Sequence, residues 1–343
     1  MGTHRDAEGK PQISAVIPPA AIAGGEFQIR GKGFATKAAR PRVSFGEAEA
    51  PLVIGSDSFV IARVPETASV GELIVRNGHQ ASSVWTCEIG IQIADGVHPV
   101  ANPAVDAAGN IFTTFSGPRG QKTPVSVYKV DLHYELKPFL SDILNATALA
   151  FDRAGLLHVS SRFDGIVYQV TSSGNMSVFA EGMGVGTGLA FDEEENLYVG
   201  DRQGTIFKIS PSRQIYVFAT LEPSIAAYHL AFGGDGYLYV TGPTTSSFDA
   251  IYRVSRSGEV EVYFRGLGRP QGLAFDAEGR LYVAASLGGW RGIVRIGEDR
   301  RPELFVSGPN IVGLAFTPAQ AMIVATNGAL YRVDAGVRGR PLP

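Results

Sequence analysis

One phrase keeps returning along this chain. It reads "TGLAFDEEENLYVGD" over residues 187–201, "YHLAFGGDGYLYVTG" from 228 and "QGLAFDAEGRLYVAA" from 271. Aligned on its central aromatic residue or valine, the phrase occurs six times at intervals of 40 to 46 residues, at Val105, Phe151, Phe191, Phe232, Phe275 and Phe316. Self-similarity at a fixed period of this length predicts a repeat architecture from about residue 100 to the end of the chain.

Each copy carries the signals of four short β-strands. An apolar run such as "GLAF" is followed by a turn with Asp and Gly, a run such as "NLYVG", a variable loop, and two further runs such as "TIFKIS" and "IYVFAT". These runs are short and rich in Val, Ile, Tyr and Phe, which excludes helical repeats. Four strands per copy are typical of a propeller blade, so the sequence predicts a six-bladed β-propeller. The alternative is an open β-solenoid, which would expose a terminal edge and favours shorter repeats.

The sixth copy is incomplete, because "VGLAF", "MIVAT" and "ALYRVD" supply three strands and no fourth follows. The segment before the first copy, "IGIQIADGVHPVANPAVD", reads like the junction between one blade and the next. We therefore predict that residues 89–94 close the ring by pairing with the sixth blade. The propeller then covers residues 89–343.

The chain before the repeats has a different organisation. Residues 1–10 are expected to be disordered, and residues 11–88 contain short strand signals joined by Gly and Pro turns, as in "PQISAVIPP", "GGEFQIRGKGF" and "RPRVSFGEAEAPL". This pattern predicts a small β-sandwich. The fold class is thus all-β, with a sandwich followed by a propeller.

Two family resemblances are carried by these phrases. The segments "ISAVIP", "GGEFQIRGKGF" and "VSFG" make residues 11–88 similar to the TIG (IPT) domain, an immunoglobulin-like module. The phrase "LAFDxxGxLYV" at this period resembles the NHL-repeat and gluconolactonase-like group of six-bladed propellers over about residues 95–336.

Composition narrows the partners and the compartment. Lys and Arg total 30 against 33 Asp and Glu, a balance that offers no broad field for nucleic acid or an anionic membrane. A single cysteine, Cys87, allows no internal disulfide, and no Cys and His cluster has zinc-site spacing. As printed, the sequence shows no signal peptide and predicts a cytoplasmic protein, whereas trimming of a longer precursor would allow an extracytoplasmic one. The oligomeric state stays open.

Function in such a propeller is expected where two sets of loops meet at one mouth of the central channel. One set starts each inner strand, and the other follows each second strand. Arg119 and Arg291 lie in the second set, and Trp290 in "SLGGWRG" has no counterpart in the other copies. The ligand-binding candidates from both sets are Arg162, Thr187, Arg202, Tyr228, His229, Gln271 and Trp290.

An enzymatic role is the alternative. The gluconolactonase resemblance implies a divalent metal in the channel, held by a carboxylate at the first inner-strand start and by Asn and Asp at later ones. Here those positions are neutral, with Ala101, Thr187, Gln271 and Val312 among them, so we predict no metal site and no cofactor. His98 and His229 are read either as a general base or as structural histidines.

The turn carboxylates after the inner strands are predicted to cap those turns, on the face away from the mouth. They are Asp106, Asp152, Asp192 and Asp276. The sequence therefore predicts a binding or scaffolding module for a small polar molecule or a peptide or protein. The alternative is a gluconolactonase-like hydrolase or lyase.

Overall fold

The computed structural model describes residues 10–36, 39–246 and 248–341. These residues form strands and turns without a helix, so the described chain has no helix that could cross a membrane. The chain divides into two compact units, residues 1–91 with 304–309 and residues 92–303 with 310–343. The disorder predicted for residues 1–10 concerns a segment that, apart from Lys10, lies outside the described residues.

The first unit contains two sheets. One has the order β1 (Gln12–Ile17), β3 (Glu26–Lys32), β7 (Phe59–Arg63) and β6 (Leu52–Gly55). The other has the order β10 (Trp85–Thr86), β8 (Glu72–Asn77), β4 (Pro41–Phe45) and β5 (Ala48–Ala50), with β9 (Gln80–Ala81) paired to β8. All these pairs are antiparallel.

A single hydrophobic cluster joins the two sheets of this unit. Phe27 and Ile29 from β3 and Phe45 from β4 belong to it, and the Phe27 and Phe45 rings lie 5.5 Å apart. Strand alternation explains this core, because every second residue of β3 is buried. Two short strands of the same unit, β2 (Ala20–Ala21) and β11 (Glu88–Ile89), pair in parallel.

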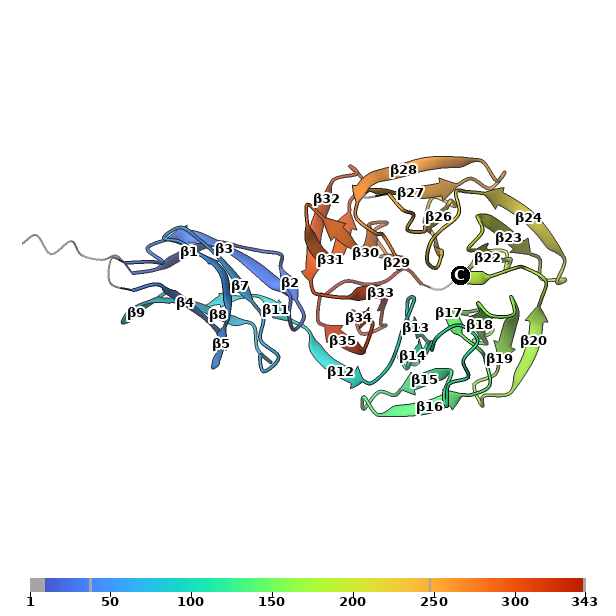
Figure 1. Cartoon of the computed structure of the whole chain (residues 1–343), viewed down its shortest axis with the longest axis horizontal. Coiled ribbons are helices and arrows are strands. Elements are labelled where there is room, and N and C mark those ends of the chain that lie inside the picture. The colour runs from blue at the N-terminus through green and yellow to red at the C-terminus, as the bar shows by residue number, and fades with distance from the viewer. Residues whose placement is uncertain (1–9, 37–38, 247, 342–343) are drawn as a thin grey trace, which may run out of the picture. The chain divides into compact units, whose positions relative to one another are not determined.

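The second unit, completed by residues 304–307 that are grouped with the first unit, is built from sheets arranged around a ring (Figure 1). The first three are β13 (Ala104–Val105), β14 (Ile111–Thr114), β15 (Val127–Val130), β16 (Leu136–Leu140); β17 (Ala146–Phe151), β18 (Leu157–Ser161), β19 (Val167–Val170), β20 (Met176–Ala180); and β21 (Gly186–Phe191), β22 (Leu197–Asp201), β23 (Thr205–Ile209), β24 (Ile215–Thr220).

The last three sheets complete the ring. They are β25 (His229–Phe232), β26 (Leu238–Thr241), β27 (Asp249–Val254), β28 (Val260–Leu267); β29 (Leu273–Phe275), β30 (Leu281–Leu287), β31 (Trp290–Ile296), β32 (Pro302–Ser307), where β2 pairs with β32; and β33 (Ile311–Phe316), β34 (Met322–Thr326), β35 (Ala329–Val333) with β12 (Ile91–Asp95). Within the described residues this makes six blades of a β-propeller with four strands each, and the sheet of the fifth blade continues from β32 into β2 and β11.

The repeated phrase is the hairpin between the first two strands of each blade. In every copy the aligned residue pairs with the residue six positions later, as in Val105 with Ile111 and Phe191 with Leu197. The turn between them is capped by its carboxylate, because Asp192 Oδ1 accepts the backbone N–H of Asn196 at 2.9 Å. Equivalent bonds from Asp106, Asp152 and Asp276 confirm the capping role predicted for these residues.

Aromatic contacts between neighbouring blades explain why the phrase is repeated. The ring of Tyr198, on the second strand of one blade, lies 5.0 Å from Phe232 on the inner strand of the next. The same edge-to-face arrangement joins Tyr239 to Phe275 at 4.8 Å and Tyr282 to Phe316 at 5.3 Å. Such pairs stabilise the packing by about 0.5 to 1.5 kcal/mol each beyond their burial. The Phe of "LAF" and the Tyr of "LYV" are therefore packing partners across blades.

The sixth blade takes its outer strand from β12, which lies next to β35 (Figure 1). Tyr331 Oη donates to Gln92 Oε1 at 3.1 Å, and Ala94 packs in a cluster with Ile323 and Leu330. The strand bounds differ from the predicted segment 89–94, since Ile89 pairs with Ala21 of β2 instead.

Candidate functional site

Two hollows lie along the axis of the ring in its described part. The mouth pocket, of about 480 Å³, lies where the inner strands begin and is lined by Thr147, Thr187, Gln271 and Val312 among others. The channel cavity, of about 780 Å³, follows along the same strands and is lined by residues such as Leu189, Ala231 and Phe275. Both volumes suit a small ligand.

Glycines lie between the mouth pocket and the channel cavity. Gly188, Gly272 and Gly313 directly follow the residues that start their inner strands. A Cβ on Gly272 would lie 2.6 Å from the Cα of Gly313 and 2.0 Å from Asn102 Oδ1, and a Cβ on Gly188 would lie 2.7 Å from a backbone oxygen of the next blade. The missing side chains therefore allow neighbouring inner strands to approach closely at this level.

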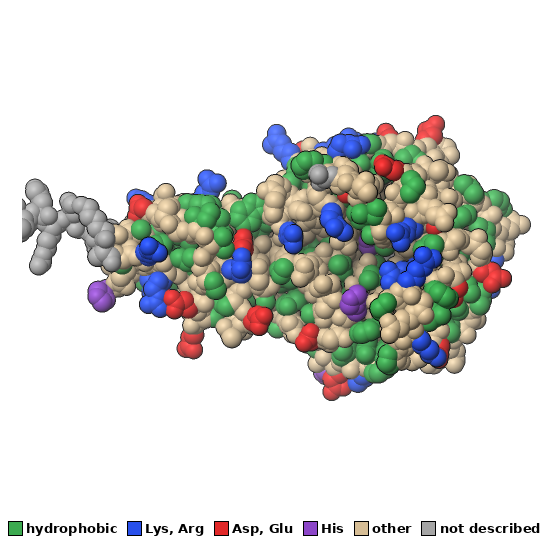
Figure 2. Space-filling view, in the orientation of Figure 1, with side chains coloured by type: hydrophobic (Ala, Val, Ile, Leu, Met, Phe, Trp, Pro, Cys, Tyr) green, Lys and Arg blue, Asp and Glu red, His purple; other side chains and the backbone are tan. Residues whose placement is uncertain are grey.

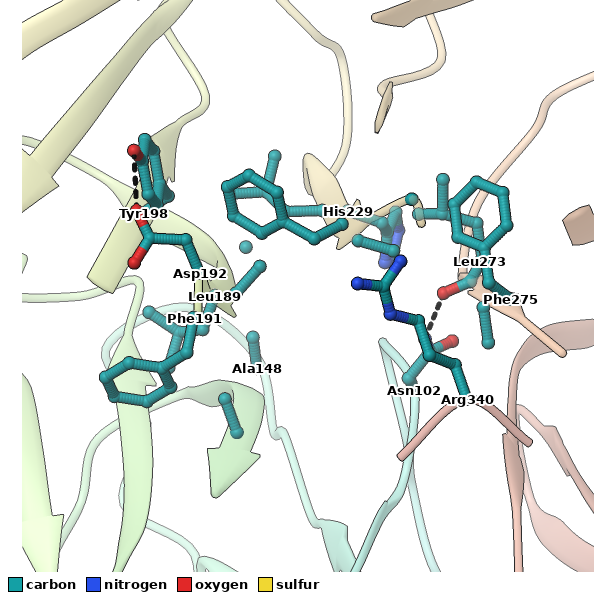
Figure 3. Close-up of a pocket in the computed structure, with 18 of the residues that line it drawn as sticks. Asn102, Ala148, Leu189, Phe191, Asp192, Tyr198, His229, Leu273, Phe275 and Arg340 are labelled. Carbon is teal, nitrogen blue, oxygen red and sulfur yellow. Dashed lines mark hydrogen bonds between the residues drawn. The ribbon is translucent and has the colours of Figure 1, made fainter. Parts of the chain in front are cut away.

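The polar groups of the channel cavity are largely bonded to each other (Figure 3). Tyr198 Oη donates to Asp192 Oδ2 at 3.0 Å on one side, and Asn102 Nδ2 donates to the carbonyl of Leu273 at 2.8 Å on the opposite side. Burial is the main cause of the raised pKa of Tyr198, followed by the charge of Asp192. These bonds hold blades and turns together, whereas the buried Nη1 of Arg340 has no hydrogen-bond partner in the described structure.

The chain's last described residues reach the far end of this cavity. Ala277 N donates to the carbonyl of Arg338 at 2.8 Å, and Arg340 N donates to the carbonyl of Phe275 at 3.0 Å. The Arg340 guanidinium then contacts Glu193 Oε1 at 3.1 Å. The C-terminal segment thus links the turn of the fifth blade to the turn of the third, which no repeat signal predicts.

His229 lines the channel cavity and not the mouth. It is only 4% exposed, and burial lowers its pKa to about 4. The imidazole is therefore neutral at pH 7, as a desolvated histidine should be.

This burial predicts a pH-dependent loss of stability. An unfolded histidine titrates near 6.5, so between pH 6.5 and 4 the unfolded state binds a proton that the folded state does not, and the free energy of unfolding falls as pH falls. From pH 7 to pH 5 the loss should be about 2 kcal/mol larger in the unmodified protein than in His229→Gln. Urea denaturation of both proteins at both pH values measures it. An equal pH dependence in the two proteins would contradict a neutral buried His229.

The mouth pocket gathers side chains from several blades. Arg119, Arg162 and Arg202 follow the second strands of the first three blades, and all three line the pocket together with Gln271. Figure 2 shows Lys and Arg side chains gathered near the centre of the ring face in view. The pKa of Arg162 is lowered, first by its burial and then by the positive charges of Arg202 and Arg119.

Four of the predicted ligand-binding candidates therefore line one pocket: Arg162, Thr187, Arg202 and Gln271. Thr187 lines the pocket, but its hydroxyl is already bonded: it donates to the carbonyl of Gly200 at 3.0 Å and accepts the N–H of Tyr228 at 3.0 Å. Arg162 and Arg202 each make one hydrogen bond to a backbone carbonyl and keep further N–H donors for a ligand. The side chain of Gln271 forms no hydrogen bond within the described chain.

Two other candidates lie elsewhere, which corrects their predicted place at the mouth. Tyr228 is 2% exposed, and its hydroxyl donates to the carbonyl of Glu222 within the core between blades. Trp290 begins β31, pairs with Leu287 across a hairpin and lines neither hollow. Tyr228 lies just before an inner strand as Gln271 does, but its ring turns into the packing between blades.

Several residues of the pocket carried no clear sequence signal. Asn327 lines the mouth from the short loop after β34. Asn145, before β17, is buried and bonds the backbone of the loop that carries Arg119. Its positive φ of 49° is a conformation that asparagine tolerates better than most residues, and this is the only hint its sequence position offers. Among the described residues, no three His, Cys, Asp or Glu side chains form a group that could hold a metal ion.

No family model and no curated protein matches this sequence. Solved structures match its fold. A proposed gluconolactonase has a TM-score of 0.62 at 16% identity, covering 74% of this chain and 94% of its own. An auxiliary nutrient binding protein from Bacteroides thetaiotaomicron has a TM-score of 0.58 at 11% identity, covering 95% and 97%.

A catalytically inactive virginiamycin B lyase from Staphylococcus aureus, solved with quinupristin, has a TM-score of 0.52 at 12% identity and covers 96% of both chains. At these identities the similarity concerns the fold alone. The chain is similar to β-propellers described as binding proteins and to β-propellers described as enzymes, so the fold is compatible with both functions.

Proposed function

We propose that this protein is a binding propeller that recognises a small polar molecule or a peptide at the mouth pocket. The carrying observation is the convergence of Arg162, Arg202 and Gln271 from three different blades on one hollow of about 480 Å³. Variable loops on a rigid scaffold are where binding residues concentrate. The balanced net charge of −3 argues against nucleic acid or a membrane surface as partner.

The mouth pocket fits this role better than the larger channel cavity. In the cavity, Asp192 and Asn102 already bond to protein groups, and Arg340 pairs with Glu193 through Nη2 while its Nη1 is buried without a partner in the described structure. At the mouth, the side chain of Gln271 forms no hydrogen bond within the described chain, so it can turn to a ligand without breaking a bond. Polar groups that fix a ligand's orientation need that freedom.

Filling the mouth should abolish ligand binding. A library of acidic and neutral sugars, dicarboxylates and short peptides is screened by thermal shift, and hits are measured by calorimetry. Gln271→Trp should weaken a hit at least tenfold, about 1.4 kcal/mol, because the indole occupies the pocket. Trp290→Ala, outside both hollows, is the matched control and should bind normally. Loss of binding in Ala231→Phe, which fills the channel cavity, with normal binding in Gln271→Trp would move the site to the cavity.

The second candidate is a gluconolactonase-like hydrolase or lyase, favoured by the gluconolactonase and the lyase among the similar structures and by His98 at the mouth. Turnover of an aldonolactone with added calcium, zinc or manganese, lost in His98→Ala, would establish it. For residues 11–88 we propose a TIG-like module, because two sheets around one core suit an immunoglobulin-like sandwich.

A further inference from the structure

We propose that the mouth pocket binds a small ligand with at least two oxyanion groups, carboxylate or phosphate, held by Arg119, Arg162 and Arg202. This inference rests on the proposed function and names the chemical class of its ligand. Guanidinium groups present forked N–H donors that match carboxylate and phosphate oxygens. Three of them in one pocket supply more positive charge than a single anionic group would neutralise.

No acidic side chain balances this charge. The residues that line the mouth pocket include no Asp or Glu. Within the described chain, Arg119, Arg162 and Arg202 form no ion pair, whereas another arginine of the same ring, Arg280, lies 2.6 Å from Asp276 Oδ2. Arg162 is partly buried, with the exposed Arg119 and Arg202 in the same pocket. Like charges around a partly buried charge cost stability, so the cluster points to a counter-charge from outside the chain.

Arg162 carries the most direct sign of a missing partner. Its Nη2 donates to the carbonyl of Gly117 at 3.1 Å, but its Nε is buried with no hydrogen-bond partner in the described structure. A buried donor without an acceptor is costly. An oxyanion in the pocket would accept from this guanidinium and reduce its repulsion with Arg119 and Arg202.

Two of the arginines, Arg162 and Arg202, are held by hydrogen bonds to backbone carbonyls before any ligand binds, and the exposed Arg119 lies on a loop whose backbone is fixed. Asn145 Nδ2 donates to the carbonyls of Gly117 and Pro118 at 2.8 and 3.0 Å, and its Oδ1 accepts the N–H of Gly120 at 2.7 Å, which fixes the loop around Arg119. Arg202 Nε donates to the carbonyl of Ser224 at 3.3 Å. Such preorganisation lowers the entropic cost of binding.

The other lining residues favour an oxyanion over a neutral sugar. The pocket contains no Phe, Tyr or Trp among its lining residues, and His98 supplies the one aromatic ring among them, so it offers little aromatic surface for a sugar ring. Gln271 and Asn327 add neutral donors and acceptors at its edge. Recognition must therefore come from charge and hydrogen bonds.

The test uses the full chain and defined probes. Citrate, pyrophosphate and the neutral sugar galactose are titrated calorimetrically at constant ionic strength. Citrate or pyrophosphate should bind, and Arg162→Gln and Arg202→Gln should each weaken binding at least tenfold, with Arg162→Lys between the two. Arg291→Gln, an exposed arginine outside both hollows, is the matched control and should bind as the unmodified protein does. Added NaCl should weaken binding, because salt screens exposed charges.

The outcomes separate the two proposals. Tighter binding of citrate would show that the ligand's oxyanion groups are carboxylates, and tighter binding of pyrophosphate would show that they are phosphates. Either result supports the inference. Anion binding that survives the triple Arg→Gln variant overturns it. If no anion binds but a neutral compound does, and Gln271→Trp blocks that compound, the inference fails while the proposed function stands. If the binding of the compounds is lost only in Ala231→Phe, the ligand lies in the channel cavity, and both the inference and the proposed function fail.

Discussion

A chain that starts at residue 97 is expected to aggregate, or to melt about 10 to 20 °C below a chain that starts at residue 91. The longer chain retains β12, which pairs with β35 and completes the sixth blade. Without it, β35 becomes an open edge and the cluster of Ala94 with Ile323 and Leu330 loses a member. An unpaired edge is a template for association with other chains.

Both truncated chains lack residues 1–90, so whatever those residues contribute is common to the comparison. Thermal melting followed by circular dichroism, with light scattering for aggregation, measures the difference. Equal melting temperatures and equal solubility would show that β12 does not close the ring.

Gly272→Val should destabilise the protein by at least about 3 kcal/mol, the upper part of the range for overpacking a core. Its Cβ would meet Asn102 Oδ1 at 2.0 Å and the carbonyl oxygen of Val312 at 2.8 Å, and backbone atoms cannot move aside as a flexible side chain can. The same change pushes apart the inner strands between the mouth pocket and the channel cavity. Chemical denaturation of the purified variant measures the loss.

Gly328→Ala is the control for this glycine. No atom lies within 4 Å of a Cβ placed there, and its φ is not in the left-handed region. Its free energy of unfolding should stay within about 0.5 kcal/mol of the unmodified protein, as for most surface substitutions. A similar loss in both variants would show that close strand approach does not set the cost.

Much of the ring could be predicted because its interactions are local and repeated. The hairpin from Phe191 to Leu197 lies within one phrase, and Asp192 caps its turn four residues away. Alternation and turn chemistry act over such distances, so they are visible in a single sequence. The same locality placed Arg162 and Arg202 in loops after second strands, where the structure brings them to one pocket.

Side-chain direction could not be predicted in the same way. Tyr228 and Gln271 both lie just before inner strands, β25 and β29, yet Tyr228 turns into the packing between blades while Gln271 lines the mouth. The Tyr228 ring can lie between the blades because Gly242 has no side chain. A Cβ at that glycine would meet the ring at 2.7 Å. A glycine fourteen residues away in the chain gives no sign of this in the sequence.

By itself, the sequence specifies an all-β chain with six copies of one hairpin, because strand period, turn residues and blade packing are written into each repeat. The tertiary structure alone shows that Arg119, Arg162 and Arg202 converge without a carboxylate, and that Arg340 reaches Glu193 across the far end of the channel. The reason is physical: these contacts join residues from different blades, and only closure of the ring sets the distances between them.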